Sequence, residues 1–222
     1  MRAHKRDPHH GPCGELGHTP KRDLKRDVVD AAVALLDRYG IADLSMRRLA
    51  RELELTPGAL YWHFADKQAL LGAVADRLLT PVEAAGSGAG CGEGWQNRIE
   101  ELCRRLRDAL LSHTDGAELV SASLAAGRSP RIEAVTAALA EAAAEGGLDP
   151  EQSELAARSI LYYVLGFTVD EQSRRQWDAA GASVAATDLG ADGPRARPDR
   201  DFGFGLRLLT DGLAVRAGAA LS

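Results

Sequence analysis

Three consecutive aromatic side chains near residue 60 are the part of this sequence best suited to contact another molecule. Tyr61, Trp62 and His63 follow one another directly. A helix cannot bury three large neighbours on one face, so at least one of them must point into solvent. Exposed rings and hydroxyl groups can contact the phosphates, sugars and thymine methyl groups of DNA. The alternative is that the rings only complete a hydrophobic core, which is the reading that fits Leu60 and Phe64 on either side.

Small residues and a lysine flank the three rings. Pro57, Gly58 and Ala59 are small, so the start of a helix carrying them could come close to the base edges of DNA. Lys67 follows four residues after the last ring, at the start of the next predicted helix, where it could neutralise a phosphate. Residues 57–67 therefore predict a surface that contacts duplex DNA.

Two short helices joined by a tight turn must hold this surface. Ser45 is a good N-cap for a helix whose apolar positions are Met46, Leu49, Ala50 and Leu53. Thr56 followed by Pro57 is typical of the start of a second, short helix. Residues 45–64 thus predict a helix-turn-helix, in which the second helix enters the major groove and the first braces against the backbone.

The rest of the chain also predicts helices, and strand signals are almost absent. One helix has apolar residues from Val28 to Tyr39 and ends at Gly40, and another begins at an N-cap Asp66 and extends to Leu79. Further helices are expected at 95–113, 117–126, 131–145, 152–176 and 202–215. The predicted fold is therefore all-α, with an N-terminal three-helix helix-turn-helix domain and a helical body.

Composition sets the domain limits. Residues 1–23 predict a polar, disordered basic tail, 24–70 the helix-turn-helix domain, and 71–222 the body. A glycine run at 86–94 is expected to be a break, and 181–200, rich in Ala, Gly, Asp and Pro, a mobile loop. Residues 1–79 carry 13 basic and 11 acidic residues, whereas residues 80–222 carry 14 and 21. This asymmetry has the sign expected of a DNA-facing front end on an acidic body.

Other classes of chemistry find little support. The sequence has no HExxH or GxSxG motif, and its three cysteines have no CxxC spacing, so neither an enzyme nor a disulfide framework is expected. The glycine run lacks a following Gly-Lys-Ser/Thr, and four His and Cys residues of the tail have no element to fix them as metal ligands. We expect no metal and no cofactor. Without an apolar run long enough for a signal peptide or a membrane span, a cytoplasmic protein is expected.

The segment LSMRRLARELELTPGALYWHFADKQALL (44–71) resembles the DNA-binding domain of the TetR family, in which LYWHF-x-x-K is highly specific. GEGWQ (92–96), ALLSHTDGA (109–117), LGFTVDEQ (165–172) and FGFGLRLLTDGL (202–213) resemble the effector domain of its tetracycline repressor branch. The likeness covers roughly residues 24–216. It implies a transcriptional repressor that binds a palindromic operator in double-stranded DNA as a homodimer and is released by a small molecule.

Carried onto this sequence, the resemblance implies which residues contact DNA: Arg47, Pro57, Gly58, Ala59, Tyr61, Trp62, His63 and Lys67. Two departures matter. Pro57 stands where the tetracycline repressors have a base-reading glutamine, which predicts a different operator sequence. Glu54 replaces the usual turn glycine, so it must tolerate that backbone geometry or the turn must differ.

The effector region departs further from the tetracycline repressors. Val120 and Asp170 stand where those proteins have a histidine and a glutamate that support a magnesium-bound drug, and valine has no lone pair to offer. We therefore expect a more apolar, metal-free effector. The predicted pocket consists of Leu102, Leu106, Leu110, His113, Val120, Leu139, Tyr162, Tyr163 and Phe167. Each of these could instead be an ordinary core residue, and His113 a partly buried histidine with a protein partner.

The dimer implied by the resemblance should pair the outer faces of helices 152–176 and 202–216 as a four-helix bundle. An effector that prefers a different spacing of the two DNA-binding domains would shift the dimer away from its DNA-competent state. Two alternatives stay open. The body could serve dimerisation alone, with no small-molecule effector, or the protein could activate rather than repress.

Overall fold

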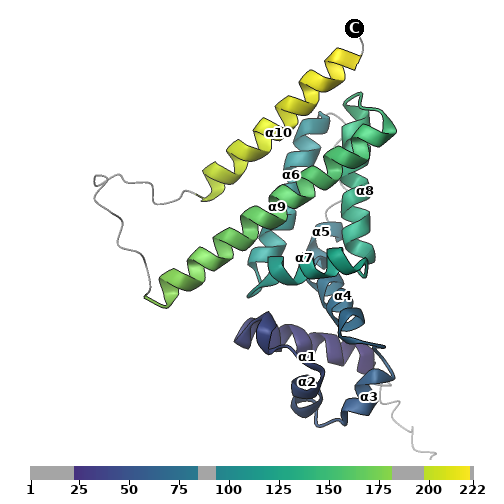
Figure 1. Ribbon diagram of the computed structural model, residues 1–222, viewed down its shortest axis with the longest axis vertical. Helices are drawn as coiled ribbons and strands as arrows, with labels where there is room; N and C mark the ends of the chain where they lie inside the picture. The colour runs from purple at the N-terminus through teal and green to yellow at the C-terminus, as the bar shows by residue number, and fades with distance from the viewer. Residues whose placement is uncertain (1–22, 85–93, 182–197, 221–222) are drawn as a thin grey trace, which may run out of the picture.

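The computed structural model describes residues 23–84, 94–181 and 198–220, and within them every regular element is a helix (Figure 1). The predicted N-terminal tail, except Asp23, and almost all of the glycine run lie outside the described residues. The predicted loop 181–200 ends earlier than expected, because a helix already begins at Pro198, and residues 182–197 also lie outside the described ranges. The all-α prediction is confirmed.

The N-terminal domain consists of α1 (Leu24–Tyr39), a 3-10 turn (Ile41–Asp43), α2 (Met46–Glu52), α3 (Pro57–Tyr61) and the start of α4 (Lys67–Leu78). The three predicted N-caps are confirmed, since each side chain accepts a hydrogen bond from a backbone N–H of the first turn. Ser45 accepts from Arg48 at 3.3 Å, Thr56 from Ala59 at 3.3 Å and Asp66 from Ala69 at 2.7 Å. These bonds satisfy donors that the start of a helix would otherwise leave free.

The domain's core is built from the apolar faces of α1, α2 and α4. Val28, Ala32 and Leu36 of α1 are fully buried, as their spacing predicted. The prediction that Tyr39 belongs to the same buried face is wrong, because its ring is 44% exposed. It stands at the last residue of the helix, where the guanidinium of Arg48 lies 3.8 Å from the ring centre, so the ring covers a charged side chain instead of entering the core.

The body contains α5 (Thr80–Ala84), α6 (Trp95–Leu111), α7 (Gly116–Ala126), α8 (Pro130–Glu145), α9 (Pro150–Ala179) and α10 (Pro198–Ala220). Helices α6, α7, α8 and α9 pack against one another around one core, and α10 lies along α9 and α6 (Figure 1). Helix α9 begins earlier than the predicted residue 152, because Asp149 caps it with a 2.8 Å bond from Gln152 N–H and Pro150 fits its first turn. In its middle Ile160, Leu161, Val164 and Leu165 are buried, whereas Ser159, Tyr162 and Gly166 are exposed.

Helix α4 connects the two domains and packs against α7 and α8 of the body. The contact is close at Gly72, where a Cβ atom would lie only 2.2 Å from the carbonyl oxygen of Arg128. Glycine is therefore required for the backbones of α4 and the segment after α7 to meet. None of the helices in the described ranges is both long enough and apolar enough to cross a membrane.

Candidate DNA-binding surface and the interior of the body

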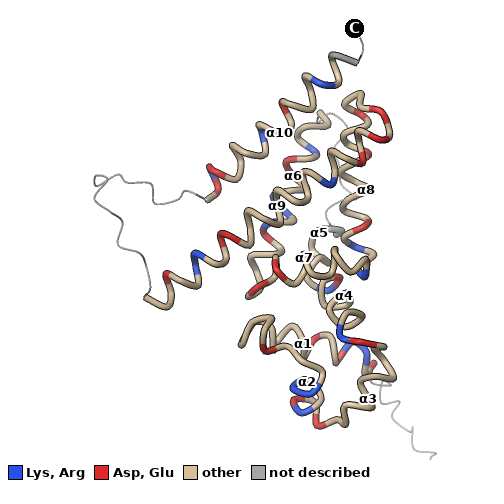
Figure 2. Tube along the Cα trace, in the orientation of Figure 1, with Lys and Arg blue, Asp and Glu red and all other residues tan. Residues whose placement is uncertain are grey.

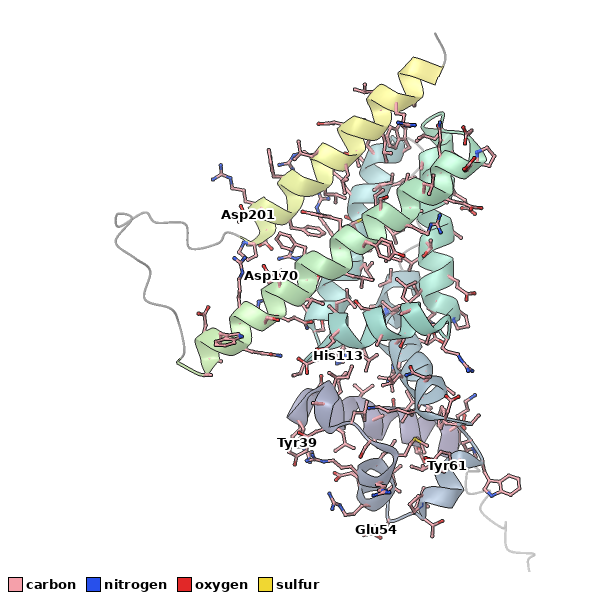
Figure 3. All side chains as sticks on the ribbon, viewed as in Figure 1. Tyr39, Glu54, Tyr61, His113, Asp170 and Asp201 are labelled. Carbon is pink, nitrogen blue, oxygen red and sulfur yellow. The ribbon has the colours of Figure 1, made fainter. Side chains whose placement is uncertain are left out.

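The turn between α2 and α3 keeps the left-handed backbone geometry that is usual for glycine, although Glu54 stands at this position. Glu54 has φ of 55°, in the left-handed region, and the Leu55 N–H donates to Ala50 O at 2.8 Å to close the turn. The backbone thus keeps the conformation in which glycine is ordinarily found, and the glutamate bears the strain of its Cβ. The exposed position of Glu54 leaves its carboxylate in solvent (Figure 3).

Helix α3 buries one side chain and exposes the row of rings that follows. Leu60 and Phe64 are buried, as predicted, and they fix the helix to the core. Tyr61 is 52% exposed and Trp62 is 90% exposed, and His63 is exposed as well. An indole so fully in solvent carries no packing role in this chain, and its apolar face is free to contact a partner.

The other residues predicted to contact DNA share this surface. Arg47 on α2, Pro57 and Gly58 at the start of α3, and Lys67 at the start of α4 are exposed, and Ala59 is partly exposed. Tyr61 and Glu54 lie at the end of the molecule farthest from α9 and α10 (Figure 3). The structure therefore brings all eight predicted residues onto the outer part of one small domain. Blue segments on α2 and near α4 show basic residues at this end (Figure 2).

Most of the residues predicted to line an effector pocket belong to the core of the body. Leu106, Leu110, Val120 and Leu139 are buried, and Leu102, Tyr163 and Phe167 are partly buried and packed against the same core. Tyr162 does not belong with them, because its ring is 61% exposed. Consecutive residues of a helix point in different directions, so Tyr162 and Tyr163 could not both face the interior.

The structure also places His113 and Asp170. His113 faces the N-terminal domain, where its Nδ1 lies 3.1 Å from both carboxylate oxygens of Asp37. It is therefore an interdomain residue with a protein partner and does not face the interior. Asp170 is exposed and pairs with Arg174 at 2.8 Å, so it does not point into this protomer's core either. The described residues contain no group of three His, Cys, Asp or Glu side chains that could hold a metal ion.

A buried ion pair lies beside the aromatic part of the core, and the sequence reasoning missed it. Arg107 of α6 and Glu171 of α9 are joined by two hydrogen bonds, and Arg107 also bonds Asp199 of α10 at 2.8 Å. Desolvation by itself lowers the pKa of the guanidinium, but the bonds and charges of Glu171 and Asp199 outweigh it, so the pKa is raised overall. The sequence does contain a signal for this burial, because Arg107 falls between Cys103 and Leu110 on an apolar helical face.

The aromatic part of the core consists of Tyr163, Phe167 and Phe202, with ring centres 5.4 to 5.9 Å apart. The Tyr163 hydroxyl donates to the Phe202 carbonyl at 2.8 Å, which fixes α10 to α9. Burial raises the pKa of this phenol. Tyr163 is thus already hydrogen-bonded within the chain and has its polar group directed at α10.

Two buried side-chain oxygens have no hydrogen-bond partner among the described residues, the Ser123 hydroxyl and Oε1 of Gln152. The Ser123 hydroxyl on α7 is fully buried and makes no hydrogen bond. Other hydroxyls on the helices of this chain bond back to their own backbone, as Ser121 does to Ala117 O at 2.7 Å and Thr168 to Val164 O at 2.7 Å. An unpaired buried hydroxyl costs about 1–3 kcal/mol, so it marks a place where a bound molecule could supply the missing bond. Sequence reasoning missed Ser123, because nothing in its spacing separates it from Ser121.

A helix-turn-helix that exposes its second helix, carried on an all-helical body with a polar group left unpaired inside, defines a DNA-binding regulator with a separate body domain. The comparisons agree. Residues 28–74 match the sequence profile of bacterial regulatory proteins of the tetR family, and residues 90–217 match that of the tetracyclin repressor-like C-terminal domain. The chain belongs to the tetR family of bacterial regulatory proteins, whose members are DNA-binding regulators and not enzymes.

Several relatives are similar along most of their length. The class A tetracycline repressor from transposon 1721 of Escherichia coli is 33% identical over 198 residues, which is 85% of this chain and 89% of the repressor. The crystal structure of Mycobacterium smegmatis BioQ is 54% identical, with a TM-score of 0.74 over 86% of this chain and 98% of BioQ. A structure of BioQ with its natural double-stranded DNA operator has a TM-score of 0.72 at 53% identity, over 86% of this chain and 97% of BioQ.

A structure with a small molecule is also similar. The Streptomyces coelicolor TetR family protein ActR in complex with (S)-DNPA is 29% identical, with a TM-score of 0.67 over 87% of this chain and 98% of ActR. The chain therefore combines the DNA-binding domain of this family with a tetracyclin repressor-like C-terminal domain.

Proposed function

We propose that this protein is a transcriptional repressor that binds a palindromic operator as a homodimer and leaves it when a small, mostly apolar molecule binds the body. The observation that carries the DNA-binding part is the exposed row Tyr61-Trp62-His63 at the end of α3, held by the buried Leu60 and Phe64. The similarity to BioQ, which has been seen with its operator, supports duplex DNA as the partner. Such a regulator acts in the cytoplasm, where the DNA is.

The homodimer follows from apolar side chains that α9 and α10 leave in solvent. Leu155 and Tyr162 of α9 are 48% and 61% exposed, and Phe204 and Leu208 of α10 are each 59% exposed. A monomer seldom exposes so many large apolar side chains on two neighbouring helices, and a second copy of the same face would cover them. Two recognition helices placed about one DNA turn apart can then read two half-sites.

The effector part rests on the core of the body. The unpaired hydroxyl of Ser123 and the neighbouring Val120 belong to α7, which packs against α4, the helix that leads to the DNA-binding domain. A molecule that displaces core side chains there would be apolar, with a polar atom for Ser123, and would need no metal. ActR, a relative with the same fold, binds (S)-DNPA.

Selection of bound DNA from a random duplex pool, with the full-length protein at physiological salt, tests this function. A pseudo-palindrome with half-sites about one turn apart is expected. Trp62→Ala should lose the enriched motif, whereas Trp177→Ala, which removes an exposed indole from α9, should keep it. Binding that varies only with salt, with no motif, would overturn the proposal.

A screen against the selected operator then tests the effector. Molecules that release the protein should act equally in the presence of a chelator. A requirement for magnesium would contradict the metal-free effector. Failure of every class of small molecule to weaken operator binding would favour a regulator whose body serves dimerisation alone.

A further inference from the structure

The turn between α6 and α7, residues 112–115, is held from one side by a glutamine of α9. The Gln172 side chain is buried, and its Oε1 accepts a bond from the Ala117 N–H at 3.1 Å. Its Nε2 donates to the carbonyl oxygens of His113 at 2.7 Å and of Leu110 at 3.1 Å. One amide therefore bonds a carbonyl in the last turn of α6, a carbonyl of the 112–115 turn and an N–H in the first turn of α7.

The same turn contacts the DNA-binding domain on its other side. Asp37, near the end of α1, accepts from the Thr114 N–H at 3.1 Å, and its carbonyl accepts from the Thr114 hydroxyl at 3.0 Å. The His113 ring lies against the same carboxylate. His113 is labelled between the two domains in Figure 3, at the level where α1 faces the body. Four residues thus join α9 to α1 through one short turn.

A second route runs in parallel through Asp115. Its Oδ1 accepts from Gln176 Nε2 on α9, and its Oδ2 accepts from the Ile41 N–H at 2.9 Å, just after α1. Asp115 itself has φ of 52°, a left-handed conformation that is strained for a residue with a Cβ atom. Such a conformation persists only where the surroundings fix it, and here the fixing bonds come from both domains.

We propose that Gln172 is a positioning residue that fixes the 112–115 turn and thereby sets how the DNA-binding domain is attached to α9. The bonds of Gln172 are to backbone atoms of Leu110, His113 and Ala117, and its side chain lies on α9, away from the exposed rings of residues 61–63. It acts on α1 through His113, Thr114 and Asp37. Since α9 also carries the exposed apolar face and part of the core, a change in either is transmitted to the DNA-binding domain through this turn. The effect on operator binding rests on the function proposed above, but the transmission itself does not.

Amide hydrogen exchange in the full-length protein, measured by NMR, tests the transmission without DNA or effector. In Gln172→Met the direct contact at Ala117 is lost. We expect the protection of the Thr114 and Ile41 amides, which Gln172 does not touch, to fall at least 10-fold as well. Gln152→Met is the matched control, because Gln152 lies on the same helix but bonds nothing in the turn, and it should leave both amides unchanged.

Gln172→Glu separates the two ends of the contact. A carboxylate can still accept from Ala117 N–H but cannot donate to Leu110 or His113, so Ala117 should stay protected while Thr114 and Ile41 lose protection. This variant also decides the question if Gln172→Met does not fold. The proposal would be overturned if the Thr114 and Ile41 amides kept their protection from exchange while the Ala117 amide lost it in Gln172→Met. The turn would then hold α1 without help from α9.

Operator affinity gives the second readout. Gln172→Met should weaken binding to the selected operator at least 5-fold, and Gln152→Met should not. If Gln172→Met kept full operator affinity although its Thr114 and Ile41 amides had lost protection, a role of Gln172 in DNA binding would be contradicted. Its role would then be structural alone. If no operator can be selected for the unmodified protein, the proposed function fails, whereas the exchange experiment still decides whether Gln172 positions α1.

Discussion

Arg107 of α6 and Glu171 of α9 form a two-point ion pair inside the body, with Nε–Oε2 and Nη2–Oε1 distances of 2.9 and 3.0 Å. The guanidinium also lies 5.0 Å from the ring centre of Phe202 on α10, so this one side chain of α6 contacts both α9 and α10. Planar two-point pairing allows little freedom in the relative positions of α6 and α9. The pair therefore fixes how these helices pack in the core of the body.

Removing one partner of this pair should be costly. Arg107→Met leaves Glu171 buried with only Arg175 as a partner, and we expect the free energy of unfolding to fall by about 3 kcal/mol. Urea denaturation measures the change. Asp170→Asn removes an exposed pair one residue away on the same helix and should cost less than about 1 kcal/mol. Equal losses in the two variants would contradict the importance of burial.

The strained turn of the helix-turn-helix offers a stabilising change. Glu54→Gly should raise the free energy of unfolding by about 1 kcal/mol, because glycine adopts the left-handed conformation without the cost of a Cβ atom. Glu54→Ala keeps the Cβ and should bring no gain. Thermal or urea unfolding of the two variants checks this. A Glu54→Ala variant as stable as Glu54→Gly would show that the charge, and not the backbone, is responsible.

Lys67 is expected to contact a phosphate, which makes a prediction about salt. Lys67→Gln should weaken binding to all sequences alike and reduce the slope of log affinity against log salt concentration by about 1. Fluorescence anisotropy with the selected operator at several salt concentrations measures the slope. Arg104→Gln on the exposed side of α6 removes one positive charge far from this surface and should leave the slope unchanged. A slope that Lys67→Gln does not alter would remove Lys67 from the contact.

The exposed face of α9 and α10 predicts a dimer that one charge can weaken. Leu208→Glu would place a carboxylate without a partner in the interface, at a cost of about 1–3 kcal/mol, which corresponds to a dimer weaker by roughly 5- to 150-fold. Sedimentation velocity over a range of concentrations measures it. Glu141→Lys on the exposed side of α8 changes charge by a larger amount but should not alter the association. A Leu208→Glu protein that remains dimeric would place the interface elsewhere.

The buried thiol of Cys103 should make the folded protein less stable at alkaline pH. Burial, and secondarily the charge of Glu100, raise the pKa of this thiol far above its usual range. In the unfolded chain the thiol ionises near pH 8.5, whereas in the folded chain it stays protonated. The folded state then binds more protons than the unfolded state, so stability falls as the pH rises above about 8.5. The raised pKa of Tyr163 acts in the same direction at higher pH.

Guanidinium unfolding at pH 7, 9 and 10 checks this dependence. In a background without Cys13 and Cys91, Cys103→Ala should lower stability at pH 7 but show a shallower loss between pH 9 and 10. Iodoacetamide should modify Cys103 slowly in the folded protein and rapidly after unfolding. Rapid modification of the folded protein would contradict the burial of the thiol.

The local parts of the fold could be predicted from the sequence because they depend on neighbours in the chain. The caps at Ser45, Thr56 and Asp66 follow from side chains that bond to the N–H three residues on. The pitch of a helix predicts that at least one of the rings at 61–63 is exposed; all three are, and α3 ends at Tyr61. Glu54 was recognised as a problem for the same reason, since turn geometry is local, and its φ of 55° confirms the concern.

Contacts between distant segments could not be predicted in this way. His113 has apolar neighbours at the expected spacing, and only the packing of α1 against the body reveals Asp37 as its partner, 76 residues away. Tyr162 and Tyr163 are alike in sequence, and the position of α10 decides which of them is covered. Arg107 was overlooked because a charged residue is ordinarily read as exposed, although its partner Glu171 lies 64 residues further on.

The close approach at Gly72 has a consequence for how freely this sequence can vary. The atom that a side chain at 72 would strike belongs to the backbone of Arg128, so every residue at 128 presents the same obstacle. Substitutions at position 128 should therefore be tolerated one by one, while position 72 admits no replacement in any of those backgrounds. The spacing between the DNA-binding domain and the helical body is thus limited by main-chain atoms, and it can persist while the surrounding side chains change.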